Sequence, residues 1–181
     1  MFVMLRSTLV VLFAIFGPAS LQAEKSTLIY PIITDHGGVV ARPSAVQQPR
    51  KGARVVFDVT ARAAAGDVNR GLDRAARLLN LYGAAGLASS DIRMVIVLHG
   101  EATTCVLNDA AYQRRFEQKN PNLPLIRQLQ RHGIEVLVCG QALNYKDIAD
   151  DELAEAIPIA AAAMTTLINK QQDGYAWLLF P

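Results

Sequence analysis

Cys139 is the side chain in this sequence that is best placed to do chemistry. It ends an apolar, β-branched run, Glu135-Val136-Leu137-Val138-Cys139, and Gly140-Gln141 follows at once. This pattern predicts a thiol where a strand stops and a loop opens, the position from which open α/β sheets usually present their functional residues. A helix starting just after the sulfur would favour the thiolate through its dipole and free backbone amides. Gly140 would allow a bulky partner to approach closely. The alternative is a free or disulfide-bonded cysteine without a catalytic role.

A second loop brings further candidates. His99 follows the apolar run Met94-Val95-Ile96-Val97-Leu98, and Cys105 lies six residues later. Imidazole exchanges protons near neutral pH, so His99 is a candidate base or hydrogen-bond partner for the sulfur of Cys139. The alternative for His99 is a histidine satisfied by backbone groups at a strand end. Glu101 is expected to be a solvated loop acid.

Several other chemistries are disfavoured. The sequence holds three histidines and two cysteines and no CxxC, HxxxH or HExxH motif, so a dedicated zinc site is not expected. No GxGxxG or GxxxxGK[ST] motif follows a strand and no GxSxG elbow occurs, so we expect no nucleotide cofactor and no serine hydrolase. A formal net charge of +2 gives no surface suited to nucleic acid.

The elements that must position these residues alternate along the chain. Strands are expected at 55–59, 94–98, 135–139 and 175–180, with an extended segment at 157–159, and helical patterns lie between them. This order predicts a mostly parallel sheet between layers of helices, an α/β fold. The loops that follow the strands, at 60–66, 99–108 and 139–145, should converge, which would place both cysteines on one rim.

For two helices the sequence also predicts the cap or the buried face. Asp67 is the expected cap of a helix whose apolar positions run from Val68 to Tyr82. A long helix is expected from Ala160 to about Gln172, in which Met164, Leu167, Ile168 and Gln171 form a stripe and Met164 fills the core.

The amino end resembles an export signal. Arg6 precedes an apolar stretch at 9–16, Gly17-Pro18 interrupts it, and small residues lead to Ala23, after which we expect cleavage. The stretch is short for a membrane span of about 20 residues, so an uncleaved anchor is the lesser alternative. We therefore expect an exported, periplasmic protein with a signal peptide at 1–23. An irregular arm at 24–53, with a short hairpin around 36–38, would precede one domain at 54–181, as 51% hydrophobic residues allow.

From about Val55 onward the sequence resembles the DsrE/DsrF-like family, relatives of sulfur-relay proteins, and more particularly its exported branch. The resemblance is carried by phrases that occur in order: 69–72 (NRGL), 76–82 (ARLLNLY), 97–100 (VLHG), 120–122 (NPN), 133–141 (GIEVLVCGQ) and 163–167 (AMTTL). It implies a three-layer α/β/α domain with a five-stranded, largely parallel sheet, often assembled as a homo-oligomeric trimer or hexamer. It also implies that Cys139 receives sulfur as a persulfide and passes it to a partner thiol. Cys105 is not part of the family pattern.

The leading hypothesis is a sulfur carrier or sulfurtransferase-like protein that forms a persulfide on Cys139, with His99, Gln141 and the amides after Cys139 stabilising the anion. Its partners would be a sulfur donor or acceptor, either a protein or a small thiol. Two alternatives stay open. One is a non-enzymatic binding or assembly module with structural cysteines, whose rim holds a small ligand or a protein partner. The other is a thiol-redox sensor that uses a Cys105 to Cys139 disulfide. The candidate substrate-binding residues are Gly140, Gln141 and Cys105.

Overall fold

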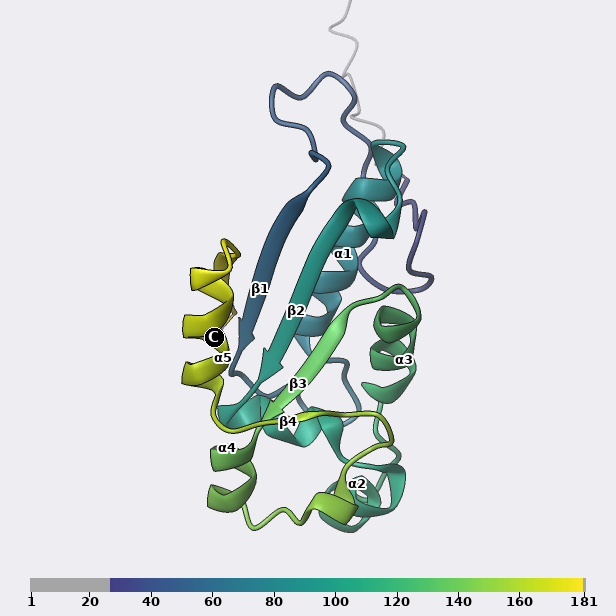
Figure 1. Cartoon of the computed structure of the whole chain (residues 1–181). Coiled ribbons are helices and arrows are strands. Elements are labelled where there is room, and N and C mark those ends of the chain that lie inside the picture. The colour runs from purple at the N-terminus through teal and green to yellow at the C-terminus, as the bar shows by residue number, and fades with distance from the viewer. Residues whose placement is uncertain (1–26, 181) are drawn as a thin grey trace, which may run out of the picture.

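Five parallel strands lie at the centre of the structure, a computed structural model that describes residues 27–180 (Figure 1). The strand order is β4-β3-β2-β1-β5, and every neighbouring pair is parallel. The strands are β1 (Ala53–Val59), β2 (Ile92–Leu98), β3 (Glu135–Cys139), β4 (Ile159–Ala160) and β5 (Ala176–Phe180). The predicted α/β fold is confirmed, and the sheet is entirely parallel.

Helices cover both faces of the sheet, which explains why β1 and β2 are almost continuously apolar. Figure 1 shows α1 and α3 on one face and α5 on the other. The helices are α1 (Arg70–Ala84), α2 (Asp109–Phe116), α3 (Leu123–Arg131), α4 (Gly140–Tyr145) and α5 (Ala163–Gln172), with short 3-10 helices at Ser89–Asp91, Gly100–Val106 and Asp150–Glu152. Alternate residues of each strand therefore enter two different cores.

The two cores differ greatly in size. The core between the sheet and α1 and α3 is extensive and includes Phe57, Leu72 and Leu129. The core beneath α5 is small, and its apolar members are mainly Val56, Val95, Val97, Leu137 and Ala163. The face beneath α5 is thus thinly covered.

The structure corrects two predictions about helices. Asn69, not Asp67, caps α1: its side-chain oxygen accepts hydrogen bonds from the N–H groups of Gly71 and Leu72, at 2.7 and 3.4 Å. In α5, Met164 does not fill the core, because 72% of it is exposed; Ile168 is also more than half exposed. The small Ala163 and the half-buried Leu167 face the sheet instead.

The segment before β1, residues 27–52, packs against the domain. Ile29 and Val39 form an antiparallel bridge, where the sequence predicted a short hairpin. The buried Asn80 of α1 anchors the turn: its oxygen accepts from the N–H groups of Ile32 and Ile33, and its amide nitrogen donates to three backbone carbonyls, those of Ile33, His36 and Gly37. The expected signal peptide at 1–23 lies outside the described residues. Within residues 27–180, no helix has the length and apolar character needed to cross a membrane.

Replacing Asn80 with alanine tests this anchor. Asn80→Ala leaves five buried or half-buried hydrogen bonds unmade, and we expect a loss of about 2 to 4 kcal/mol in the free energy of unfolding. Asn169→Ala, in exposed α5 sequence, is the matched control and should stay within about 0.5 kcal/mol of wild type. Urea denaturation measures both; equal stabilities of the two variants would contradict the anchor.

Candidate functional site

Four residues from four adjacent strands lie in an oblique row on the α5 face, which starts at the carboxyl edge of the sheet and ends near the amino end of β5. Cys139 ends β3, His99 follows β2, Asp58 lies near the end of β1, and Trp177 belongs to β5. The register pairs Leu98 with Val138, so the next residues, His99 and Cys139, are neighbours across β2 and β3. His99 has extended backbone angles, which continue the alternation of the strand and point its side chain to the same face as that of Cys139.

Asp58 is the fixed point of the row. It is only 5% exposed, and its two carboxylate oxygens have different partners. Oδ1 lies 2.6 Å from His99 Nε2, and Oδ2 accepts a hydrogen bond of 3.0 Å from Trp177 Nε1. A buried carboxylate needs such donors, because its desolvation is costly when it is left unpaired.

This contact sets the orientation and the tautomer of His99. A carboxylate only accepts hydrogen bonds, so the imidazole donates from Nε2 and Nδ1 carries the lone pair. Among the described residues, Nδ1 has no hydrogen-bond partner. Every buried side-chain nitrogen or oxygen of these residues does have a partner, so Nδ1 is not buried. Nδ1 is therefore accessible and free to accept a proton.

The backbone around His99 is held just as firmly. Its N–H donates to the carbonyl of Val59, at 3.1 Å, and the N–H of Ala102 donates to the carbonyl of Thr60. Gly100 has a φ of +55°, the left-handed conformation by which the chain leaves β2 and enters the 3-10 helix. The imidazole is thus placed by β1 as well as by its own strand.

The sulfur of Cys139 faces a helix, but not the one that follows it in sequence. Sγ accepts a hydrogen bond of 3.2 Å from the N–H of Ala163, the first residue of α5. Cys139 makes no side-chain bond to α4, although it is the N-cap residue of that helix. Ala162, the N-cap of α5, has no side chain that could cap it, so the sulfur takes that place. A negative charge on Sγ would meet both an N–H donor and the positive end of the α5 dipole.

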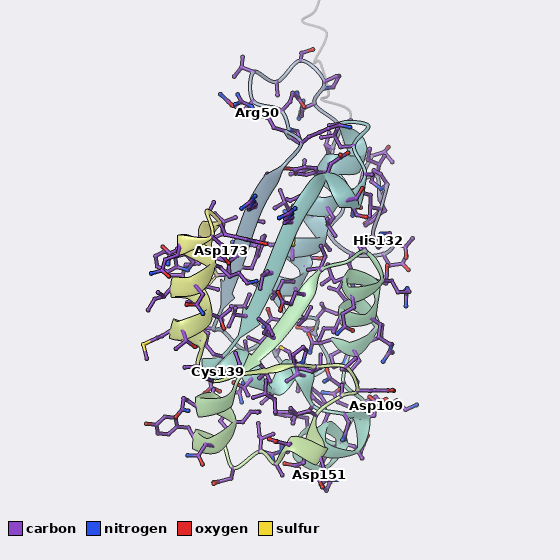
Figure 2. The ribbon with its side chains drawn as sticks, in the orientation of Figure 1. Arg50, Asp109, His132, Cys139, Asp151 and Asp173 are labelled. Carbon is purple, nitrogen blue, oxygen red and sulfur yellow. The ribbon has the colours of Figure 1, made fainter. Side chains whose placement is uncertain are left out.

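A cavity of about 520 Å³ opens above this sulfur. Figure 2 shows Cys139 at the end of β3, where α4 and α5 meet. The lining includes Cys139 and His99 and is otherwise mostly apolar: Ala142, Tyr145, Ala162, Ala163, Met164 and Leu167, with Gly100, Gln141 and Lys146. The site therefore combines a thiol, an imidazole and an apolar chamber.

The other predicted site residues lie in different places. Gln141 lines the cavity and donates through Nε2 to the carbonyl of Ala161, which fixes the loop before α5. Gly140 does not line it. A Cβ at Gly140 would approach the carbonyl oxygen of Ala160 to 3.0 Å, so the close partner is the neighbouring strand β4.

Cys105 does not share the rim with Cys139, contrary to the prediction. It is buried in the larger core, on the α1 and α3 face, whereas Cys139 belongs to the core beneath α5. Both thiols are free. Burial raises the pKa of the Cys105 thiol to about 12, because the thiolate would lose its hydration. The loop after β2 turns as a 3-10 helix, and this turn carries Cys105 through to the other face.

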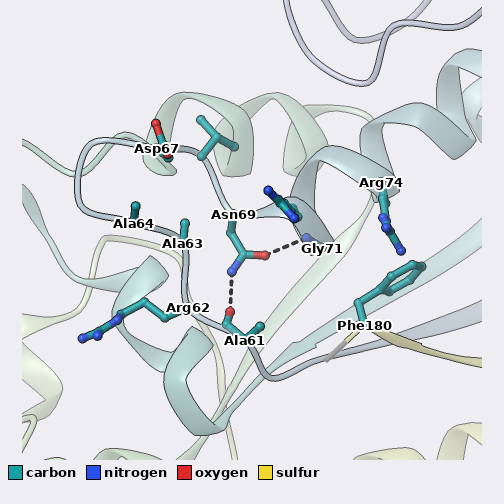
Figure 3. A pocket seen from close by; sticks show the side chains of 11 residues that line it. Ala61, Arg62, Ala63, Ala64, Asp67, Asn69, Gly71, Arg74 and Phe180 are labelled. Carbon is teal, nitrogen blue, oxygen red and sulfur yellow. Dashed lines mark hydrogen bonds between the residues drawn. The ribbon is translucent and has the colours of Figure 1, made fainter.

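A separate hollow of about 600 Å³ lies near the amino end of α1 (Figure 3). In it the Asn69 amide donates to the carbonyl of Ala61, and the guanidinium of Arg74 lies over the ring of Phe180. Within residues 27–180, no group of three or more His, Cys, Asp or Glu side chains is arranged to hold a metal ion.

Fold and site together define an α/β/α protein that presents a thiol at the carboxyl edge of a parallel sheet. Residues 54–180 match the DsrE/DsrF-like family, and the chain belongs to that family. The solved structure of a protein of unknown function, MTH1491 from Methanobacterium thermoautotrophicum, shares the fold with a TM-score of 0.55 and 18% identity. The match covers 71% of this chain and 99% of that one. No curated protein matches the sequence.

Alkylation should distinguish the two thiols. At pH 8 a thiol with a pKa near 12 is ionised to about one part in 10,000. Cys105 is enclosed by core side chains, whereas Cys139, although only 6% exposed, lines the cavity. We expect iodoacetamide to modify Cys139 in the native, reduced protein and Cys105 only after unfolding. Peptide mass spectrometry identifies the modified residue. Equal labelling of both cysteines in the native state would contradict the assignment.

Proposed function

We propose that this protein carries sulfane sulfur as a persulfide on Cys139 and passes it to a thiol acceptor. The observation that carries the proposal is the position of Sγ, which meets the amino end of α5 at the floor of an apolar cavity and lies beside His99. Membership of a family associated with sulfur relay supports it.

The row of residues suits each step of such a transfer. His99 Nδ1 takes the proton of the Cys139 thiol, and Asp58 stabilises the imidazolium that results. The thiolate attacks the outer sulfur of a donor persulfide, the donor S–S bond breaks, and the leaving thiolate takes the proton from His99.

Release of the sulfur reverses the same chemistry. The thiolate of an acceptor, either a protein cysteine or a small thiol, attacks the outer sulfur of the Cys139 persulfide, and Cys139 leaves as a thiolate. That thiolate is stabilised by the N–H of Ala163 and the dipole of α5. No external oxidant or reductant is needed in either direction.

The direct test is the mass of the reduced protein after incubation with a persulfide donor. Wild type should gain about 32 Da, the mass of one sulfur atom, and lose it again on addition of excess thiol. Cys105→Ser should behave as wild type, and Cys139→Ser should gain nothing. An equal gain in mass by the Cys139→Ser variant would contradict the proposal.

Asp58→Asn tests whether the contact between Asp58 and His99 contributes to sulfur transfer. The Asn amide cannot accept from both Trp177 Nε1 and His99 Nε2 as the carboxylate does, so the imidazole loses its fixed tautomer. We expect sulfur loading of Cys139 to slow by about 10- to 100-fold, with the same final mass. Asp150→Asn, an exposed acid outside the cavity, is the control. An unchanged rate in a folded Asp58→Asn variant would remove Asp58 and His99 from the mechanism.

A further inference from the structure

The walls of the cavity above Cys139 are built for a ligand without charge. Small and aliphatic side chains form most of its surface, from Ala142 in α4 to Met164 and Leu167 in α5. Tyr145, which is 86% exposed, contributes its ring and an uncharged hydroxyl at the mouth.

Apart from the Tyr145 hydroxyl at the mouth, each polar side chain that lines the cavity already has a partner within the protein. Lys146 pairs with Glu101, and that contact lowers the pKa of the Glu101 carboxyl, so the pair is neutral as a whole. Arg62, whose charge also acts on Glu101, does not line the cavity.

The side chains of His99 and Gln141 also have partners within the protein. His99 is paired with Asp58, so a proton taken up by the imidazole is balanced by the carboxylate. Gln141 uses its amide nitrogen on the carbonyl of Ala161. Among the described residues that line the cavity, none offers an uncompensated cation.

The geometry points to a sulfur donor that is a small persulfide with an apolar R group, which enters the cavity in its protonated, uncharged form R–S–SH, and not an oxyanion such as thiosulfate. This inference rests on the proposed function and names the substrate class of the same site. A dianion that enters the cavity loses its water without gaining a cation, which disfavours it strongly. An apolar R group gains by leaving water for contact with Met164 and Leu167.

The step balances without a further reactant. The Cys139 thiol and R–S–SH give the Cys139 persulfide and R–SH: one S–S bond forms at Sγ, the donor S–S bond breaks, and the proton travels through His99 Nδ1 to the departing thiolate. With R–SH as a neutral product, nothing charged has to leave the apolar cavity.

The test compares two donors, butyl hydropersulfide and thiosulfate, on the reduced full-length chain, with the rate of the 32 Da gain at Cys139 followed by mass spectrometry; that gain is about the mass of one sulfur atom. Each rate is divided by the rate of the same donor with N-acetylcysteine, which removes the donor's intrinsic reactivity. We expect the normalised preference for the butyl donor to be about tenfold or more.

A charge placed in the wall should change that preference. Met164 lines the cavity and is largely exposed, so Met164→Lys adds a cation there without burying it. Ile168→Lys is the matched control, because Ile168 is exposed one helical turn further along α5 and does not line the cavity. Met164→Lys should shrink the preference about tenfold in favour of thiosulfate, and Ile168→Lys should leave it unchanged.

The outcomes separate this inference from the proposed function. Equal normalised rates for both donors in wild type, or equal shifts in the two lysine variants, would overturn the uncharged donor and leave Cys139 as a sulfur carrier. No gain from either donor would overturn the proposed function and the inference with it.

Discussion

The parallel register of β3, β2, β1 and β5 is the constraint on which the rest of the site depends. It pairs Leu98 with Val138 and Val56 with Trp177, and so sets a thiol, an imidazole, a carboxylate and an indole in a row on one face. A slip of one residue in any of the four strands would turn its side chain to the opposite face. The buried Asp58 carboxylate, held by Trp177 Nε1 and His99 Nε2, in turn ties the outermost of these strands to the imidazole.

The helix α5 meets two structural requirements that conflict. It covers the thinner face of the sheet, and its first N–H group reaches the sulfur of Cys139. Full coverage would need larger side chains where Ala162 and Ala163 stand, and these would fill the cavity above the thiol. Leaving Met164 exposed costs burial of apolar surface, but keeps the cavity above the sulfur open.

Most of the fold could be predicted from the sequence, because apolar runs such as 94–98 and 135–139 indicate buried parallel strands when helical patterns separate them. The role of Cys139 as a strand-end thiol and the place of His99 beside it also follow from topology. What could not be predicted came from contacts distant in sequence: Ala163 lies 24 positions from the sulfur it meets, and Trp177 lies 119 positions from Asp58. Asp58 did leave a signal, a lone acid inside the apolar strand 55–59. Cys105 was misplaced because loop position does not tell which face a side chain enters.

The most direct measurement of the central claim is a crystal structure of the reduced protein after exposure to an uncharged persulfide. The account predicts one additional sulfur atom bonded to Cys139 Sγ inside the apolar cavity, with His99 still bound to Asp58 and Cys105 unmodified. An unmodified Cys139, or sulfur attached to Cys105 instead, would contradict it.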